Sequence, residues 1–140
     1  MKIKAAIIGM GIGSKHLEAI ENYKGSKVKI ICEKNKKKLN ILKKKFPDKI
    51  VTDNERIIYL DKEINLVSIA SYDNYHFNQI INCLRFNKNI IVEKPMCLNL
   101  SQLKKIYNLL KNKKKIRIMS NLVLRVNSLF KSFKKKLNYK

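Results

Sequence analysis

The chain has 140 residues, which fits one domain and leaves little room for two. Its hydrophobic share of 45% excludes wholesale disorder. No apolar run approaches the ~20 residues that cross a bilayer, and no signal-peptide pattern opens the chain, so we expect a cytoplasmic protein without a membrane span. The net charge of +22 admits a polyanion-binding role. Nucleic acid is nevertheless an unfavoured partner, because only four of the 32 basic residues are arginines and aromatic residues do not interleave with them.

Short apolar runs alternate with amphipathic stretches, a pattern typical of βαβ units in a parallel sheet. The predicted strands are residues 3–8, 28–32, a weaker one at 49–52, 64–70, 89–93 and 116–119. Apolar residues at helical spacing lie between them, within 14–23, at Leu39/Leu42/Phe46, at Phe77/Ile80/Ile81/Leu84 and at Leu100/Leu103/Tyr107/Leu110. The predicted fold class is therefore α/β, a doubly wound parallel sheet in a single domain.

Three local signals refine this pattern. Pro47 ends the second helix, and Asn99 with Gln102 forms a capping box at the start of the last one. Beyond Asn121 the pattern weakens, and residues 131–140 are expected to be a frayed basic tail. Three cysteines without C-x-x-C spacing indicate buried free thiols, and neither a disulfide framework nor a metal site.

A cluster of glycines follows the first strand. Gly9, Gly11 and Gly13 are three of the four glycines of the chain, and a predicted helix begins directly after them. A tight turn without Cβ atoms lets a pyrophosphate approach the helix N-terminus, where free N–H groups favour an anion. In the dinucleotide fingerprint G-x-G-x-x-G the third position holds Ser14, or the turn is shorter and Gly13 takes that role. An ordinary tight turn is the alternative interpretation.

Glu33 ends the second strand about 20 residues past Gly13, where a carboxylate can accept hydrogen bonds from the adenosine ribose. A carboxylate at this place repels a ribose phosphate, so we expect NAD as the cofactor, with NADP less favoured. Lys34 could offset that repulsion. A solvated charge at the end of a strand is the alternative interpretation of Glu33.

Two later segments are more specific. Residues 67–76 read Val-Ser-Ile-Ala-Ser-Tyr-Asp-Asn-Tyr-His, and residues 90–95 read Ile-Ile-Val-Glu-Lys-Pro. Together with the glycine loop they resemble the Gfo/Idh/MocA family of NAD(P)-dependent oxidoreductases. The resemblance runs from Lys2 to about Arg125, and the Glu-Lys-Pro triplet is its most diagnostic element.

The resemblance implies a role for each matching residue of the first half. Gly9, Gly11, Ile12 and Gly13 match the turn that binds the pyrophosphate, and Glu33 matches the ribose acid. The implied fold is the Rossmann fold, and the implied cofactor is a nicotinamide dinucleotide.

In the second half, Ser71 and His76 match the Thr and His of the family's T-P-N-x-x-H loop, which lies along the cofactor. Tyr72 and Asp73 replace the Pro and Asn of that motif, which is a departure from the family pattern. A histidine at the helix N-terminus or in the core is the alternative interpretation of His76.

The resemblance also implies a catalytic residue. Glu93 and Lys94 match the strand end beneath the nicotinamide, where the family's lysine helps to bind the substrate and to tune proton transfer. A surface lysine is the alternative for Lys94. Asn121 and Arg125 resemble the N-x-x-x-R that follows the sixth strand, and His16 is interpreted as structural or near the phosphates.

The implied domain organisation limits the expected activity. Residues 1–120 would be the dinucleotide-binding domain and residues 121–140 the start of a crossover to a C-terminal domain that the chain lacks. That domain carries the family's D-x-x-x-H motif, whereas no Asp, Glu or His follows Glu93 here. We therefore expect part of an oxidoreductase for sugar or sugar-nucleotide hydroxyl and carbonyl groups, truncated or split and inactive alone.

Completion by a separate C-terminal-domain chain or by a homo-oligomer is possible on this interpretation. Two other functions stay open. One is a non-catalytic dinucleotide-binding module, and the other is a basic polyanion-binding protein on a Rossmann scaffold.

Overall fold

The computed structural model describes residues 2–137, in which six strands form one parallel sheet. They are β1 (Ile3–Ile8), β2 (Ser26–Cys32), β3 (Ile50–Thr52), β4 (Leu66–Ile69), β5 (Asn89–Val92) and β6 (Ile118–Ser120). Their order in the sheet is β3-β2-β1-β4-β5-β6: the chain adds β2 and β3 on one side of β1, and then β4, β5 and β6 on the other. This is the doubly wound arrangement, so the predicted fold class is confirmed. The expected strand at 64–70 is shorter than predicted, and the last strand begins later, at Ile118.

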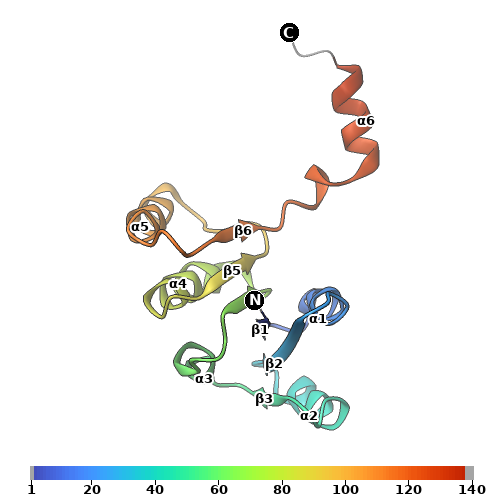
Figure 1. The fold of residues 1–140 in the computed structure, drawn as a ribbon, viewed down its shortest axis with the longest axis vertical. Coiled ribbons are helices and arrows are strands. Elements are labelled where there is room, and N and C mark those ends of the chain that lie inside the picture. The colour runs from blue at the N-terminus through green and yellow to red at the C-terminus, as the bar shows by residue number, and fades with distance from the viewer. Residues whose placement is uncertain (1, 138–140) are drawn as a thin grey trace.

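Helices cover both faces of the sheet (Figure 1). They are α1 (Gly13–Glu21), α2 (Lys36–Lys45), α3 (Arg56–Leu60), α4 (Asp73–Arg85), α5 (Leu100–Leu110), the 3-10 turn η1 (Val123–Arg125) and α6 (Ser128–Lys136). Helices α1 and α2 lie on one face, and α3, α4 and α5 lie on the other. The sequence pattern does not predict α3, because five residues are too few for a helical period to register, although Ile58 and Tyr59 are buried there.

Each face has its own apolar layer, because successive side chains of a strand point to opposite sides. In β1, Ala5 and Ile7 pack toward α1 and α2, whereas Ala6 and Ile8 pack toward α3, α4 and α5. All four are at most 2% exposed. The two-sided burial explains why residues 5–8 of β1 are a continuous apolar run rather than an alternating one.

Side chains begin and end the helices largely as predicted. Asn99 Oδ1 accepts the Gln102 N–H at 3.0 Å, which confirms the predicted start of α5. Gln102 Oε1 accepts from the Leu98 N–H at 2.9 Å, one residue earlier than in a strict capping box. The helix α2 ends at Lys45, before Pro47. The apolar stripe of α5 is mostly exposed, and the buried residue of that helix is Ile106.

The prediction of a frayed tail at 131–140 is wrong for 131–136, which belong to α6. The side chain of Asn127 caps this helix by accepting the N–H groups of Leu129 and Phe130 at 3.0 and 3.3 Å. Residues 138–140 of the expected tail lie outside the described residues. In Figure 1, α6 projects away from the sheet and its helices. Its apolar side chains, which include Phe133, are exposed.

The three cysteines differ in burial. Cys32 and Cys83 are buried and free, as predicted, whereas Cys97 is only partly buried because it lies in the loop after β5. Burial raises the pKa of Cys32 to about 12.

No helix within residues 2–137 combines the length and the apolar character needed to span a bilayer.

Candidate functional site

Candidate residues follow the carboxyl ends of β1, β2, β4, β5 and β6, which share one edge of the sheet. At each end one further backbone N–H continues the ladder by bonding to the neighbouring strand. These bonds, of 2.8 to 2.9 Å, start from the N–H groups of Gly9, Glu33, Ala70, Glu93 and Asn121. The ladder therefore fixes the backbone of every candidate segment. In an open parallel sheet, this edge is where ligands bind.

The three glycines of the loop have three different surroundings. Gly9 has φ +88°, and a Cβ atom there would lie 2.5 Å from the carbonyl oxygen of Ala70. A Cβ on Gly13 would lie 3.0 Å from Cγ2 of Ile7, so this residue brings α1 close to the sheet. Gly13 thus takes the third glycine role, while Ser14 is exposed and donates to the Gly11 carbonyl oxygen at 2.9 Å. The shorter-turn interpretation is the one that the structure supports.

Gly11 faces open space. No atom lies within 4 Å of a Cβ built on this residue. Among residues 2–137, no acceptor is found for the N–H of Gly11 or of Ile12. Both groups lie at the N-terminus of α1, where the helix dipole adds to their attraction for an anion. The loop therefore fits a pyrophosphate, which would supply the acceptors that the protein does not.

Glu33 is tied to this loop. Its Oε2 accepts the Met10 N–H at 3.0 Å, and its Oε1 accepts the Asn35 N–H at 2.9 Å. The residue is 9% exposed, which does not fit a solvated charge at a strand end. A carboxylate has about four lone-pair sites, so both oxygens can accept further bonds. The group can thus brace the loop and still bind a ribose hydroxyl.

Lys34 is directed away from Glu33. Its Nζ donates to the carbonyl oxygen of Asp53 at 2.8 Å, and Lys36 forms an ion pair with the carboxylate of the same residue. The hydrogen bond from Lys36 lowers the pKa of Asp53. The cation next to Glu33 in sequence therefore does not neutralise it in space.

A partly buried chain of hydrogen bonds begins at Ser71. Its hydroxyl donates to Gln79 Oε1 at 2.7 Å, and the Gln79 amide donates to Glu55 at 2.9 Å. The Tyr59 hydroxyl donates to the other oxygen of Glu55, also at 2.9 Å. Gln79 is 3% exposed, so the chain runs through the interior from α3 to the start of α4. The Ser71 proton is used inward, and its oxygen stays available to accept a bond from a ligand.

His76 lies beneath two loops of this edge. It is fully buried, with Nδ1 2.8 Å from the Pro95 carbonyl oxygen and Nε2 3.1 Å from the Ser71 carbonyl oxygen. Both ring nitrogens therefore face the backbone of the protein rather than open space. This position agrees with the interpretation of a core histidine, which ties the loop before α4 to the turn after β5.

The carboxylate of Glu93, directly after β5, bonds to residues of two other segments, and one of these, His16, also contacts β4. Its Oε1 lies 2.9 Å from His16 Nε2 and accepts the Asn121 amide at 2.6 Å. The other nitrogen of His16, Nδ1, lies 2.7 Å from the Ser68 hydroxyl. Burial raises the pKa of Glu93, but the hydrogen bonds from Asn121 and His16 outweigh it, so the pKa lies below its usual value. Glu93 is therefore held ionised and in one orientation.

Lys94 follows directly and is exposed. No partner for its amine is found within residues 2–137, where only its backbone N–H contacts Glu93, at 3.4 Å. The amine is thus free to meet a ligand at the edge. Arg125 is also exposed, but it lies on η1, beyond the last strand.

Three residues behind the site, which bond to its members or to one another, have little or no sequence signal. Ser68 is a polar residue in the buried run of β4, and Gln79 shares the buried face of α4 with His76. Glu55, just before α3, has no periodic signal. A polar residue at a position that the pattern assigns to the core is the sign that could have identified the first two.

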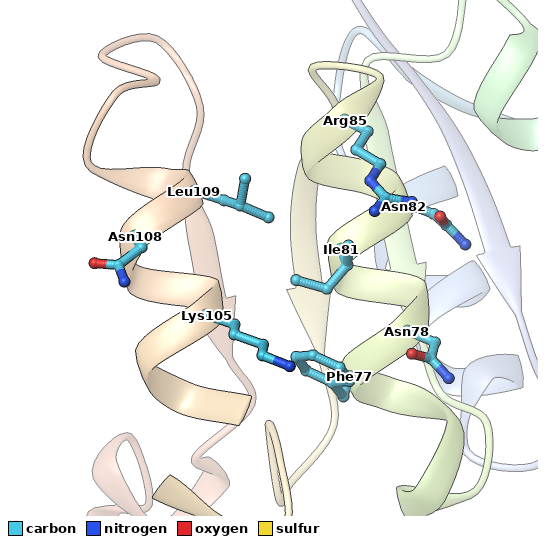
Figure 2. A pocket seen from close by; sticks show the side chains of 8 residues that line it. All are labelled: Phe77, Asn78, Ile81, Asn82, Arg85, Lys105, Asn108 and Leu109. Atoms are coloured by element: carbon cyan, nitrogen blue, oxygen red, sulfur yellow. The ribbon is translucent and has the colours of Figure 1, made fainter. Parts of the chain in front are cut away.

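A groove of about 500 Å³ lies apart from this edge, between α4 and α5 (Figure 2). Phe77, Ile81 and Leu109 form its apolar part, and Arg85 and Lys105 are its charged residues. No residue of the glycine loop, Glu33 or Lys94 lines it, so it is not part of the candidate site. Among the described residues there is no group of three or more His, Cys, Asp or Glu that could hold a metal ion.

Comparison with known proteins agrees with a Rossmann fold of a dinucleotide-binding family. Residues 3–121 match the model of the Gfo/Idh/MocA family, described as an oxidoreductase family with an NAD-binding Rossmann fold. The uncharacterized oxidoreductase YdgJ of Escherichia coli is 27% identical over 112 residues, which make up 79% of this chain and 32% of YdgJ. The chain thus spans about a third of this curated relative.

Two solved structures share the fold. Scyllo-inositol dehydrogenase from Lactobacillus casei, with bound NAD(H) and scyllo-inositol, superposes with a TM-score of 0.86 at 20% identity, covering 99% of this chain and 41% of that one. The 3-ketoreductase KijD10 from Actinomadura kijaniata, in complex with TDP-benzene and NADP, gives 0.85 at 16% identity, covering 99% and 44%. One neighbour holds NAD(H) and the other NADP, so the fold does not decide between these cofactors.

Proposed function

The chain belongs to the Gfo/Idh/MocA family of oxidoreductases, and from this premise we propose that it holds the nicotinamide dinucleotide for hydride transfer to or from a sugar or sugar-nucleotide carbon. The observation that carries the proposal is the pair of free N–H groups at Gly11 and Ile12. The space beside Gly11 is open, because a Cβ on this residue would have no neighbouring atom of the described residues within 4 Å. These groups would bind the pyrophosphate, and Glu33 would bind the adenosine ribose. When bound, the nicotinamide accepts or returns the hydride.

A cofactor titration tests this site. We expect the 140-residue chain to bind NAD(H) weakly, as measured by calorimetry or by nicotinamide fluorescence. Gly11→Val should abolish binding, because its side chain would occupy the space of the phosphates, at a position where a Cβ meets no other part of the fold. Undetectable binding by folded wild-type protein at millimolar cofactor would contradict the proposal.

We propose NAD rather than NADP as the cofactor. The supporting contact is Glu33, whose charge is not compensated, because Lys34 and Lys36 are both bound to Asp53. Glu33→Gln keeps the shape of the side chain and removes the charge, so it should narrow the preference for NAD. Lys34→Ala serves as the control and should leave the preference unchanged. Equal affinity of the wild type for NAD and NADP would rule out this assignment.

Lys94 is proposed as the catalytic residue. Its amine is free, exposed and placed at the edge where the substrate would meet the nicotinamide. An ammonium can donate to the oxygen of the substrate, and the amine can take up the hydroxyl proton when the hydride leaves. Ser71 would accept a bond from the cofactor, and His76 would hold the two adjacent loops in place.

We propose that the 140 residues bind the cofactor without turnover of their own. Hydride transfer requires the substrate carbon to be held against the nicotinamide, and the described edge has only one wall, formed by the sheet ends. A further domain, in the same or another chain, would form the second wall.

A cytoplasmic location remains a prediction, in keeping with three unpaired cysteines.

An assay with a panel of sugars and sugar nucleotides tests this limit. We expect no hydride transfer by the 140-residue protein and activity once a polypeptide with the complementary domain is added. That gain would also separate an oxidoreductase from a non-catalytic dinucleotide-binding module. Robust turnover by the 140-residue protein alone, lost in Lys94→Ala, would show instead that it is a self-sufficient enzyme.

A further inference from the structure

His16 is the residue of α1 that connects this helix to the ends of β4 and β5. Its Nδ1 lies 2.7 Å from Ser68 Oγ, and its Nε2 lies 2.9 Å from Glu93 Oε1. The side chains of His16 and Glu93 are only 12% and 13% exposed. Asn121 adds a bond of 2.6 Å to the same carboxylate oxygen, from the residue after β6.

The chemistry of the partners fixes the proton on one nitrogen. A carboxylate oxygen can only accept, so Nε2 of His16 carries a proton and donates it to Glu93. Nδ1 then accepts from the Ser68 hydroxyl when the ring is neutral, or donates to it when the ring is charged. In both cases the bond to Glu93 persists.

Serine, histidine and glutamate in one chain of hydrogen bonds resemble the triad of a hydrolase. Ser68, however, is fully buried in β4, between β1 and β5. A nucleophile must reach the carbon that it attacks, and no substrate can approach this hydroxyl. The group of residues therefore does not perform covalent catalysis, and its effect must be on position.

We propose that His16 is a positioning residue that sets the distance between the two ends of the dinucleotide site. His16 lies in the first turn of α1, just after the free N–H groups of Gly11 and Ile12, and Glu93 directly precedes Lys94. The bond between His16 and Glu93 thus connects the pyrophosphate end of the site to the nicotinamide end. This inference rests on the proposed function.

Preorganisation is the physical reason for an effect on binding. The dinucleotide is a long ligand that must contact both ends at once. If the two ends move independently, binding must restrict that motion, and the affinity falls. A link that holds the ends in register before binding avoids that loss.

A matched pair of variants tests the bond to Glu93. In His16→Gln, the side-chain amide can occupy the place of Nε2 and still donate to Glu93. In His16→Asn, which is one methylene shorter, the amide can reach Ser68 but not Glu93. Ser68→Ala removes only the other bond. The readouts are the dissociation constant for NADH, from calorimetry, and the urea midpoint of the protein without cofactor.

We expect NADH affinity to remain near that of the wild type in His16→Gln and Ser68→Ala. In His16→Asn it should fall by about tenfold, the usual effect of losing a hydrogen bond to a charged group. Glu93→Ala reads the same bond from the other partner if His16→Asn does not fold. The double variant His16→Asn/Glu93→Ala should bind no more weakly than the weaker single variant, because both changes remove one link.

The outcomes separate this inference from the proposed function. If the wild type binds NADH and His16→Asn lowers only the urea midpoint, His16 is merely structural and the inference is wrong. Equal losses in His16→Gln and His16→Asn would also overturn it, because the bond to Glu93 would then not matter. If the folded wild type does not bind NADH at all, the proposed function itself fails.

Discussion

The segment around the glycine loop and the segment that follows β6 differ in how their side chains are packed. Around the loop, side chains are bonded or packed within the fold: Glu33 accepts from the Met10 N–H, and Gly13 lies against Ile7, while, within the described part of the chain, the N–H groups of Gly11 and Ile12 stay free. Among residues 2–137 no buried side-chain nitrogen or oxygen lacks a hydrogen bond. After β6, by contrast, Leu129, Phe130 and other large apolar side chains are exposed.

The difference shows which part of the chain can be understood by itself. The geometry of the loop follows from contacts within residues 2–121, so its binding properties can be tested on this protein. The apolar side of α6 has no such contacts with the sheet, and an amphipathic helix gains its stability mainly by packing. Substitutions at the packed positions of the loop should therefore have large effects on stability, and substitutions on α6 should have small ones.

The largest effect is expected at Gly9. Gly9→Ala should lower the free energy of unfolding by about 3 kcal/mol or more, because it combines a left-handed φ with an overlap against the Ala70 carbonyl. The matched change Gly11→Ala should alter stability by less than about 0.5 kcal/mol, because its Cβ meets no atom. Urea denaturation of both variants, followed by circular dichroism, measures the difference.

The change at Gly11, which should leave stability almost unaltered, is expected to alter cofactor binding. Gly11→Ala should weaken NADH binding by about tenfold, because its methyl group would crowd the phosphates. Similar stability losses in both variants would show that the loop is uniformly packed, and the contrast between the two glycines would then be lost.

The core and α6 provide the second comparison. Ile80 is fully buried in α4, so Ile80→Ala should cost about 2–5 kcal/mol through lost contacts and a cavity. Phe133 is 59% exposed in α6, so Phe133→Ala should change stability by less than about 0.5 kcal/mol. Urea midpoints at equal protein concentration give both values.

A clear stability loss in Phe133→Ala would mean that α6 packs against something in solution, and sedimentation at several concentrations would show whether that is a second copy. The opposite finding, a small effect of Ile80→Ala, would contradict the assignment of the core face of α4.

The same contrast explains how far the sequence could be interpreted. The order of strands and helices is predictable because each strand of a parallel sheet is a short apolar run, and glycines and helix caps separate the elements. The glycine loop and Glu33 can be singled out from the sequence, because binding a dinucleotide would require those residue types at that spacing. Helix α6 was missed because four of its residues are lysines, which obscure the spacing of Leu129, Phe130 and Phe133.

Long-range partners could not be predicted. His16 and Glu93 are 77 residues apart, and His16 and Ser68 are 52 apart, so only the folded sheet brings them together. The sequence identified His16, Glu93 and Asn121 individually, through the family resemblance, but it gave no reason to join them. It also could not show that Lys34 turns toward Asp53, which depends on the neighbouring strand.

The smallest effect is expected in the dependence of stability on acidic pH. Interactions in the folded state lower the pKa of six carboxyl groups: Glu21, Asp48, Asp53, Asp61, Glu63 and Glu93. All lie before Lys94, and no carboxyl side chain follows it. A lowered pKa means that the folded state favours the ionised form. The resulting stability is complete above the pKa of the unfolded chain, near 4, and is lost as the pH falls through the folded-state pKa.

We therefore expect the urea midpoint to fall between pH 6 and pH 3, and Glu93 to contribute measurably because its side chain is only 13% exposed. Glu93→Gln should lower the midpoint at pH 7 and reduce its fall in acid. Asp48→Asn is the control, because that side chain is 58% exposed and its pairing with Lys49 is screened by water, so its pH profile should match the wild type. Far-UV circular dichroism in urea at each pH provides the measurement. If Asp48→Asn changed the acid profile as much as Glu93→Gln, burial at the carboxyl edge of the sheet would not be what distinguishes Glu93. General charge repulsion in this basic chain would then explain the acid sensitivity.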